Sequence, residues 1–333
     1  MHNERLLIPF SMIKREELHR NFIDALKRKI PVKAKLVDLL MEILFIEKGA
    51  ANRRLSGEVP FSFYEAASIA ERLDLSLNSL VKTNSAPVDR FELNIIKYTD
   101  MSESDYKEWE DYNGLISTTK SDPDSEMLES SNVLPLSIYA GFDSLQKYYL
   151  FKYTYLFQGT ENRIAFGDLA FPERLSRIYE SYFKETKYFA KTIYIWDYLI
   201  FQYLVTDIRF FSGINLISEN EIRQIKADLF SLLDYMEDIA LNGCFKETGN
   251  PAFLYISDVN LEADYSCLTF HEKYLSHLRT FILSSVVSID YLTYAKLREW
   301  IFSLKRFSTL ITLTGTVYRT DFFTKQRKII SDL

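Results

Sequence analysis

The sequence has few of the residues that crosslink a fold or anchor it in a membrane. Only two cysteines, Cys244 and Cys267, occur in 333 residues, so we expect buried thiols and no disulfide scaffold. The longest apolar candidate, Tyr194–Val205, contains Asp197 and Gln202, which predicts no membrane-spanning helix. The opening residues MHNERLLIPF lack the features of a secretory signal. We therefore expect a cytoplasmic protein without membrane contact.

Motifs for catalysis, cofactors and metals are also missing. None of the ten glycines forms a dinucleotide fingerprint or a phosphate loop. His271-Glu272 and His277 suggest a zinc site, but six residues place the imidazoles on different sides of a helix, whereas zinc proteases use a spacing of four. Cys244 and Cys267 have no metal-spaced partner and no local base. We predict no cofactor, no metal site and no enzyme; a catalytic second domain is an alternative that only its size supports.

Charge is divided unevenly along the chain. The whole sequence has a net charge of −6. Residues 1–82 contain 14 Lys and Arg and 11 Asp and Glu, a net charge of +3, whereas residues 83–333 contain 26 and 35, a net charge of −9. A mildly basic N-terminal part on an acidic remainder suits a protein that contacts phosphates at one end only.

The N-terminal part shows a series of amphipathic helix patterns. Leu18, Phe22, Ile23 and Leu26 are spaced for one helix face, and Pro31 ends that pattern. Ser62-x-x-Glu65 is a capping box. The predicted helices cover Glu16–Lys29, Lys33–Leu44, Glu47–Leu55 and Ser62–Leu73, and Ser76 is expected to cap a last short helix. Two helices joined by a tight turn, the second short and basic, can place that second helix in a DNA major groove.

The segment FIEKGAANRRLSGEVPFSFYEAASIAERLDLSLNSL carries a resemblance to a known family. It resembles the lambda-repressor/Cro-like helix-turn-helix of xenobiotic-response-element type regulators, within a bacterial group in which such a module precedes a long C-terminal region. The positions that fit the family's pattern are Ile46, Ala51, Leu55, Gly57, Ala67, Ala70, Leu73, Leu75, Ser76 and Leu80. The resemblance implies a transcriptional regulator that binds double-stranded DNA.

The expected DNA contacts lie on the short basic helix and at the start of the helix before it. They are Lys33, Lys35, Lys48, Gly49, Asn52, Arg53 and Arg54. Arg53 and Arg54 lie about 100° apart on a helix, so they cannot both face one groove, and we favour Arg53. Glu47 stands where the family usually has Ser or Thr, Gly49 and Ala50 replace polar residues, and Phe45 stands where the turn often has Gly. These departures support an alternative, an interaction or scaffold protein whose helix-turn-helix no longer binds DNA strongly.

The rest of the chain is predicted as an acidic connecting segment and a second domain. Residues 83–135 form the connecting segment, packed on the second domain, with a strand around Phe91–Ile95 and a helix at Met101–Thr119. Residues 136–333 form an α+β sensor or dimerisation domain. Its predicted helices are Gly141–Phe157, Pro172–Tyr203, Ser218–Leu241, Tyr291–Phe307 and Gly315–Asp332. For Pro172–Tyr203 a break near Thr186 is an alternative to one continuous helix. The predicted antiparallel meander comprises Ala252–Ser257, Ser266–His271 and Arg279–Ser288. The fold class is thus mainly α: a four- or five-helix helix-turn-helix domain, then a larger, mostly helical α+β domain with a small antiparallel sheet.

Aromatic residues are unusually frequent in the second domain. The chain has 22 Tyr and 25 Phe, concentrated after residue 139. Seven tyrosines could line a pocket for a flat or apolar ligand: Tyr148, Tyr149, Tyr153, Tyr155, Tyr194, Tyr198 and Tyr203. We favour the other interpretation, an aromatic-rich core. We also predict a homodimer held mainly by residues 136–333, with a small-molecule or protein effector acting on this domain.

Overall fold

The computed structural model describes residues 15–73, 75, 77, 92–93, 96–158 and 163–333. The chain divides into two compact units, residues 1–88 and 89–333. Ser76, Leu80, Phe91 and Ile95, which carried expectations above, lie outside the described residues. Within the described part, no helix is long and apolar enough to cross a membrane, and Cys244 and Cys267 are free thiols, half-buried and buried respectively.

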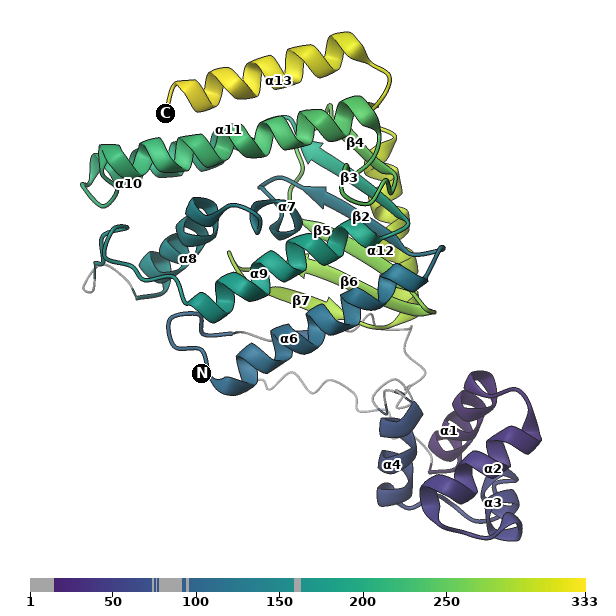
Figure 1. The fold of residues 1–333 in the computed structure, drawn as a ribbon. Helices are drawn as coiled ribbons and strands as arrows, with labels where there is room; N and C mark the ends of the chain where they lie inside the picture. The colour runs from purple at the N-terminus through teal and green to yellow at the C-terminus, as the bar shows by residue number, and fades with distance from the viewer. Residues whose placement is uncertain (1–14, 74, 76, 78–91, 94–95, 159–162) are drawn as a thin grey trace, which may run out of the picture. The chain divides into compact units, whose positions relative to one another are not determined.

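The first unit is helical, as predicted (Figure 1). Its helices are α1 (Arg15–Lys29), α2 (Lys33–Leu44), α3 (Lys48–Leu55) and α4 (Phe63–Leu73). The predicted capping box is confirmed: the Ser62 N–H donates to Glu65 Oε2 at 2.8 Å, and the Glu65 N–H donates to Ser62 Oγ at 3.2 Å. The helices bury one apolar cluster, which contains Phe22, Ala25, Leu26, Leu36, Val37, Leu40, Ala51, Leu55 and Ile69.

The second unit is built on an eight-stranded mixed sheet in its described part (Figure 1). The strand order is β1-β7-β6-β5-β2-β3-β4-β8. β2, β3 and β4 are mutually parallel, and the other neighbours are antiparallel. The strands are β1 (Glu92–Leu93), β2 (Glu126–Ser131), β3 (Lys191–Asp197), β4 (Ala252–Ser257), β5 (Tyr265–Phe270), β6 (Lys273–Arg279), β7 (Ser285–Ser288) and β8 (Ser308–Leu310).

This sheet corrects three sequence predictions. The small antiparallel sheet was wrong, because the sheet is mixed and β4 pairs in parallel with β3 rather than with β5. A continuous helix over Pro172–Tyr203 was wrong, because the helix ends at Glu185, next to the alternative break at Thr186, and β3 follows it. From Thr192 to Asp197 every residue of β3 is buried, so the strand lacks the alternation of a half-exposed strand and reads as a continuous apolar run. Arg279–Ser288 is not one strand either, since it spans the end of β6, a turn and β7.

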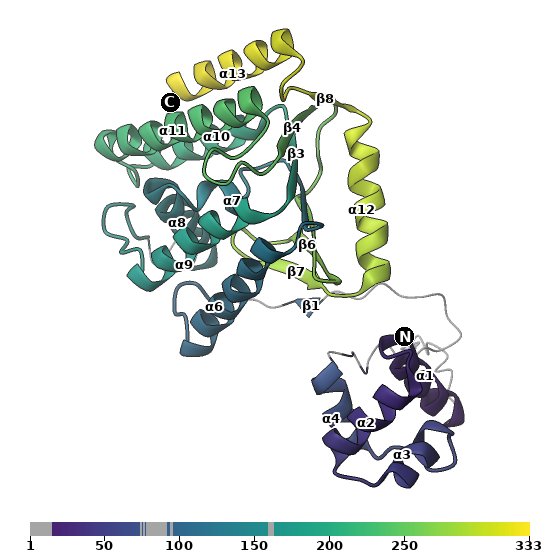
Figure 2. The same cartoon turned by 45° about the vertical axis from the view of Figure 1, so that its right-hand side comes forward.

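Helices cover both faces of the sheet (Figures 1 and 2). One face carries α6 (Glu103–Ser117), α7 (Leu136–Tyr139), α8 (Asp143–Gln158), α9 (Glu173–Glu185), α10 (Ile200–Gly213), α11 (Glu219–Asn242) and α13 (Thr316–Ser331); the other carries α12 (Tyr291–Lys305). The core beneath the first group contains Met127, Tyr194 and Trp196, whereas α12 packs on Leu128, Ile193 and Cys267. The region predicted as a connecting segment therefore supplies α6 and β2 to the second unit.

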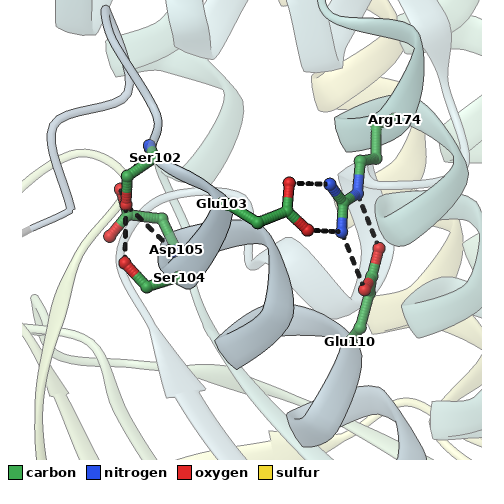
Figure 3. Close-up of polar contacts among 6 residues, drawn as sticks. All are labelled: Ser102, Glu103, Ser104, Asp105, Glu110 and Arg174. Atoms are coloured by element: carbon green, nitrogen blue, oxygen red, sulfur yellow. Dashed lines mark hydrogen bonds and ion pairs between the residues drawn. The ribbon is translucent and has the colours of Figure 1, made fainter.

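Helix α6 is fixed to α9 by polar contacts (Figure 3). Arg174 of α9 donates from Nη1 to Glu103 at 2.7 Å and from Nε to Glu110 at 2.8 Å, and both acceptors belong to α6. The side-chain amide of Asn113 donates to the Ile178 carbonyl at 2.8 Å in the buried interface between the two helices. These contacts position α6 over the edge of the sheet that contains β6 and β7.

Candidate functional site

Four of the five expected DNA contacts on α3 lie on one side of the helix, and Arg54 does not lie with them. Lys48, Gly49 and Arg53 are exposed and Asn52 is half-buried, whereas Ala51 and Leu55 are buried. At 100° per residue, the first four span an arc of about 140° on the helix. A Cβ at Gly49 would meet no atom within 4 Å, so packing does not require glycine there. The exposed arc therefore offers two cations and a stretch of uncovered backbone.

Arg54 points to a different partner. Its Nε and Nη2 donate to Glu65 Oε1 of α4 at 3.0 and 2.6 Å, and the Arg54 side chain is 18% exposed. Burial raises the pKa of Glu65, but its bonds with Arg54 and Ser62 outweigh that effect, and the pKa is lowered. This pair links α3 to α4 and leaves Arg54 less accessible than Arg53. Lys33 and Lys35 are both exposed in the first turns of α2.

Three aromatic rings stand out from the first unit into solvent. Phe45, in the turn between α2 and α3, is 94% exposed, and Phe63 and Tyr64 at the start of α4 are 84% and 79% exposed. Phe45 also has a left-handed backbone, with φ 52° and ψ 45°, which disfavours residues that carry a Cβ. These rings contribute little to the apolar core, and we refer to the three of them as the exposed aromatic set.

The second unit contains a cavity of about 420 Å³ between the sheet and its helices. Strands β2, β5, β6 and β7 form its floor, and the walls come from α6, α7, α9, the segment before α6 and the loop after β6. Its aromatic walls include Tyr98, Trp109, Tyr112, Tyr139 and Tyr182. The volume falls within the range of about 300–1,000 Å³ that is typical of small-molecule sites.

The strand register explains how polar groups reach this cavity. Glu129 of β2 lies opposite Ser266 of β5, and Ser266 lies opposite His277 of β6. Directly opposed residues point to the same face of a sheet, so these three side chains form one row across the floor. Ser266 is small, so the middle of the row is low between two larger side chains.

One end of the floor is braced by a partly buried ion pair. Arg279 Nη1 donates to Asp264 Oδ2 at 3.1 Å and to the Leu134 carbonyl at 3.2 Å, while its Nε and Nη2 donate to the Ile282 carbonyl at 3.0 and 2.6 Å. The other carboxylate oxygen of Asp264 accepts from the Asn132 N–H at 2.8 Å. The guanidinium is thus already occupied by protein acceptors on three of its nitrogens.

Glu129 is a carboxyl group of this cavity whose pKa lies close to neutral pH. Burial raises the pKa of its carboxyl to about 7; the nearby Asp264 adds to the rise, while a hydrogen bond from Ser137 Oγ and the charge of Arg279 oppose it. Both protonation states are therefore populated near neutral pH. The carboxyl can accept a hydrogen bond in one state and both donate and accept in the other.

His277 and Ser284 hold unused hydrogen-bonding atoms at the cavity. Burial lowers the pKa of His277 to about 4, so its ring is neutral near pH 7. Its Nε2 and the Oγ of the buried Ser284 are buried atoms without a hydrogen-bond partner among the described residues. Unpaired buried polar atoms are costly, which makes them the natural contacts for a bound molecule.

The tyrosines singled out from the sequence are not those of the cavity. Tyr148, Tyr149, Tyr153 and Tyr194 are buried in the main core, and Tyr155 and Tyr198 pack against it, which confirms the core interpretation for these six. The seventh, Tyr203, is 45% exposed. Two of the cavity tyrosines, Tyr98 and Tyr112, come from the region that was predicted to connect the domains, and the others, Tyr139, Tyr182 and Tyr265, come from the predicted second domain.

The polar residues of the cavity carried weak sequence signals. Glu129 is one of twelve acids between residues 83 and 140, a region we interpreted as a solvated face. His277 was considered as a zinc ligand and rejected because of its spacing from His271. Among the described residues, no group of three or more His, Cys, Asp or Glu side chains could hold a metal ion. Asp264, just before β5, and Arg279, at the end of β6, have no motif in common. Only the alternation of β6, with Leu275, His277 and Arg279 on one face, hinted that these side chains share a surface.

Comparisons with known proteins add no further constraint. The chain matches no model of a protein family, no curated protein and no solved structure. The functional interpretation therefore depends on the residues and geometry described above.

Proposed function

We propose that the protein is a DNA-binding transcriptional regulator whose first unit acts as a helix-turn-helix. In this proposal α2 and α3 are the two helices of the motif, and α3 enters the major groove. The observation that carries the proposal is the division of α3 into a buried side, Ala51 and Leu55, and an exposed side with Lys48 and Arg53. Lys48 and Asn52 would contact base edges, and Arg53 and the lysines of α2 would contact phosphates.

Three further features support this assignment. The net charge of +3 over residues 1–82 favours approach to a polyanion. The open space around Gly49 would let a DNA strand approach the backbone. The segment from Phe45 to Leu80 resembles the lambda-repressor/Cro-like pattern. Arg54 is less suited to a DNA contact than Arg53, because it is paired with Glu65.

A second function is favoured by a specific observation, the exposed aromatic set. Phe45, Phe63 and Tyr64 present large apolar surfaces of the kind found at protein–protein interfaces. In this alternative the first unit is an interaction module that has lost strong affinity for DNA, and Glu47 at the start of α3 would repel a phosphate.

Selection of bound sequences from a random duplex pool tests the first proposal with the full chain. A regulator enriches one motif, and its affinity for that motif falls linearly in log–log form as salt rises. No enrichment, together with no salt-dependent binding to mixed duplex DNA, would leave the interaction module as the better function.

The regulator is further proposed to act as a homodimer held by the second unit. One helix-turn-helix unit covers about 600–1,000 Å² of DNA contact, and two units on a two-fold axis read two half-sites about one helical turn apart. Sedimentation of a fragment that begins at residue 89 tests this. A fragment that stays monomeric at tens of micromolar would assign pairing to the first unit or to DNA.

A further inference from the structure

The cavity of the second unit carries an inference that does not depend on DNA binding. Its occupant is constrained by three observations: the charge of the lining, the shape of the floor and the identity of the unused polar atoms. Each narrows the chemistry of the molecule that would fit.

The charge of the lining disfavours an anionic ligand. Among the described residues that line the cavity, Arg279 is the only permanent cation. Its donors are directed at Asp264 and at the carbonyls of Leu134 and Ile282, so a phosphate or carboxylate would have to displace protein acceptors. It would also meet the negative charge of Asp264 and, when ionised, of Glu129, which costs binding energy in a desolvated site.

The shape of the floor favours a flat molecule. Glu129 and His277 lie on strands that flank β5, two strand spacings or roughly 10 Å apart between their backbones. Ser266 occupies the low point between them. Trp109 and Tyr112 of α6 and Tyr182 of α9 supply aromatic walls, and the Tyr112 ring lies 5.9 Å from the His277 ring. Aromatic surfaces of this kind stack on or pack against planar rings.

The polar atoms of the cavity determine which hydrogen-bond donors and acceptors a planar ligand needs along its edge. Burial brings the Glu129 carboxyl to a pKa of about 7, so it can donate and accept at once near neutral pH. A protonated carboxyl pairs best with an N–H donor adjacent to a ring-nitrogen acceptor. The neutral ring of His277, with an unpartnered Nε2, and the unpartnered Oγ of Ser284 offer further contacts for nitrogen or oxygen atoms of the ligand.

We propose that this cavity binds an uncharged, planar nitrogen heterocycle of about two fused rings, which lies over Ser266 with an adjacent N–H donor and ring-nitrogen acceptor directed at Glu129. A nucleobase-like ring is the natural example of this chemistry. The proposed DNA binding does not involve this cavity. A negative result for ligand binding would therefore leave the proposed function of the first unit unchanged.

Titration calorimetry on the full chain without DNA tests this with three matched probes. 7-Azaindole has an N–H next to a ring nitrogen, indole has the same shape without the ring acceptor, and indole-2-carboxylate adds a negative charge. We expect 7-azaindole to bind about tenfold more tightly than indole, the effect of about one good hydrogen bond, and the carboxylate to bind more weakly than both.

Two variants and a control locate the binding. Glu129→Leu should remove the preference for 7-azaindole over indole, and Ser266→Leu should block both probes by filling the floor. Glu299→Gln, on the exposed side of α12, should change neither. Because Ser266→Leu alters a different strand, it keeps the test decisive if Glu129→Leu fails to fold.

The proposal is overturned if indole binds as tightly as 7-azaindole or if the carboxylate binds best. It is also overturned if no probe binds at millimolar concentration, or if binding survives both cavity variants unchanged.

Discussion

The two units differ in how far their candidate polar contacts are exposed to solvent. In the first unit the candidate contacts, Lys48 and Arg53, are exposed, and the buried cluster of helices is apolar. In the second unit the candidate contacts, Glu129 and His277, line an internal cavity with shifted pKa values. An exposed cation acts over distance and is screened by salt, whereas a desolvated carboxyl or imidazole acts by direct contact and is costly when unpaired.

This difference predicts how each unit responds to mutation. Removing an exposed contact from the first unit should change binding and leave folding intact. Removing a polar group from the cavity of the second unit should change folding as well. The three tryptophans, Trp109, Trp196 and Trp300, all belong to the second unit, so their fluorescence reports its unfolding without signal from the first.

The largest effect is expected for Arg279→Met. The substitution leaves the partly buried Asp264 carboxylate without its cation. Loss of one partner of a buried ion pair destabilises proteins by about 3–5 kcal/mol, which is the upper end of the effect expected here. Urea unfolding followed by tryptophan fluorescence should show this loss in the second unit, while the first unit is unaffected. Arg306→Met, at an exposed position after α12, is the matched control. Equal stabilities of the two variants would show that the Arg279–Asp264 pair does not brace the sheet.

A smaller, pH-dependent effect is expected for Glu129→Gln. The pKa of Glu129 is about 7 in the folded protein against an ordinary 4.5, so the folded state holds the proton more tightly. Its contribution to stability is complete below pH 4.5 and is lost as pH rises through about 7.

Relative to the wild type, Glu129→Gln should therefore gain stability between pH 5 and pH 8, approaching roughly 3 kcal/mol. The measurement is a series of urea transitions in that range. A difference between the two proteins that does not vary with pH would mean that the carboxyl is not desolvated as described.

The same contrast explains which parts of the structure could be predicted from sequence. The helices of the first unit and α11 follow from local patterns. The predicted capping box at Ser62 marks the start of α4 correctly, and α11 begins one residue after the predicted start at Ser218, where the structure also has a capping box. Strand β2 was missed because its sequence, EMLESS, shows no regular alternation: Glu129 and Ser131 face the cavity, whereas Glu126 pairs with Arg298 of α12 on the other face. Strand β3 was missed because burial on both faces removes the alternation.

The cavity could not have been assembled from local patterns. Its polar floor depends on the pairing of β2 with β5 and of β5 with β6, and β2 precedes β5 by more than a hundred residues. Single residues such as Glu129 give no sign of such pairing in one sequence. The N-terminal basic face was predictable because a single helix presents it.

The double substitution Lys48→Ala with Arg53→Ala tests whether the exposed cations of α3 contact DNA. It should weaken duplex binding by about 2 kcal/mol, roughly thirtyfold, and reduce the steepness of the salt dependence. Far-UV circular dichroism should show an intact fold. Lys27→Ala with Arg72→Ala removes the same charge from the first unit outside α3 and should have a smaller effect. If both double variants bind DNA equally, net charge rather than the α3 face determines binding.

The smallest effect on stability is expected at Phe45. This residue is exposed, yet its replacement should change the free energy of unfolding of the first unit. Phe45 adopts a left-handed backbone, which costs residues with a Cβ about 1–2 kcal/mol, and its ring buries almost nothing in return. Phe45→Gly should therefore stabilise the first unit, by about 0.5–1 kcal/mol after the entropy that glycine adds to the unfolded chain.

Phe45→Ala is the matched control, since it removes the same ring but keeps the Cβ and should give no gain. Thermal unfolding followed by far-UV circular dichroism compares the two variants. A gain from glycine alone would mean that the chain retains a strained, exposed aromatic ring at a cost to stability, as expected if that ring contacts a partner. Equal stabilities would place the turn in a relaxed conformation and leave the interaction-module alternative supported only by the exposure of the three rings.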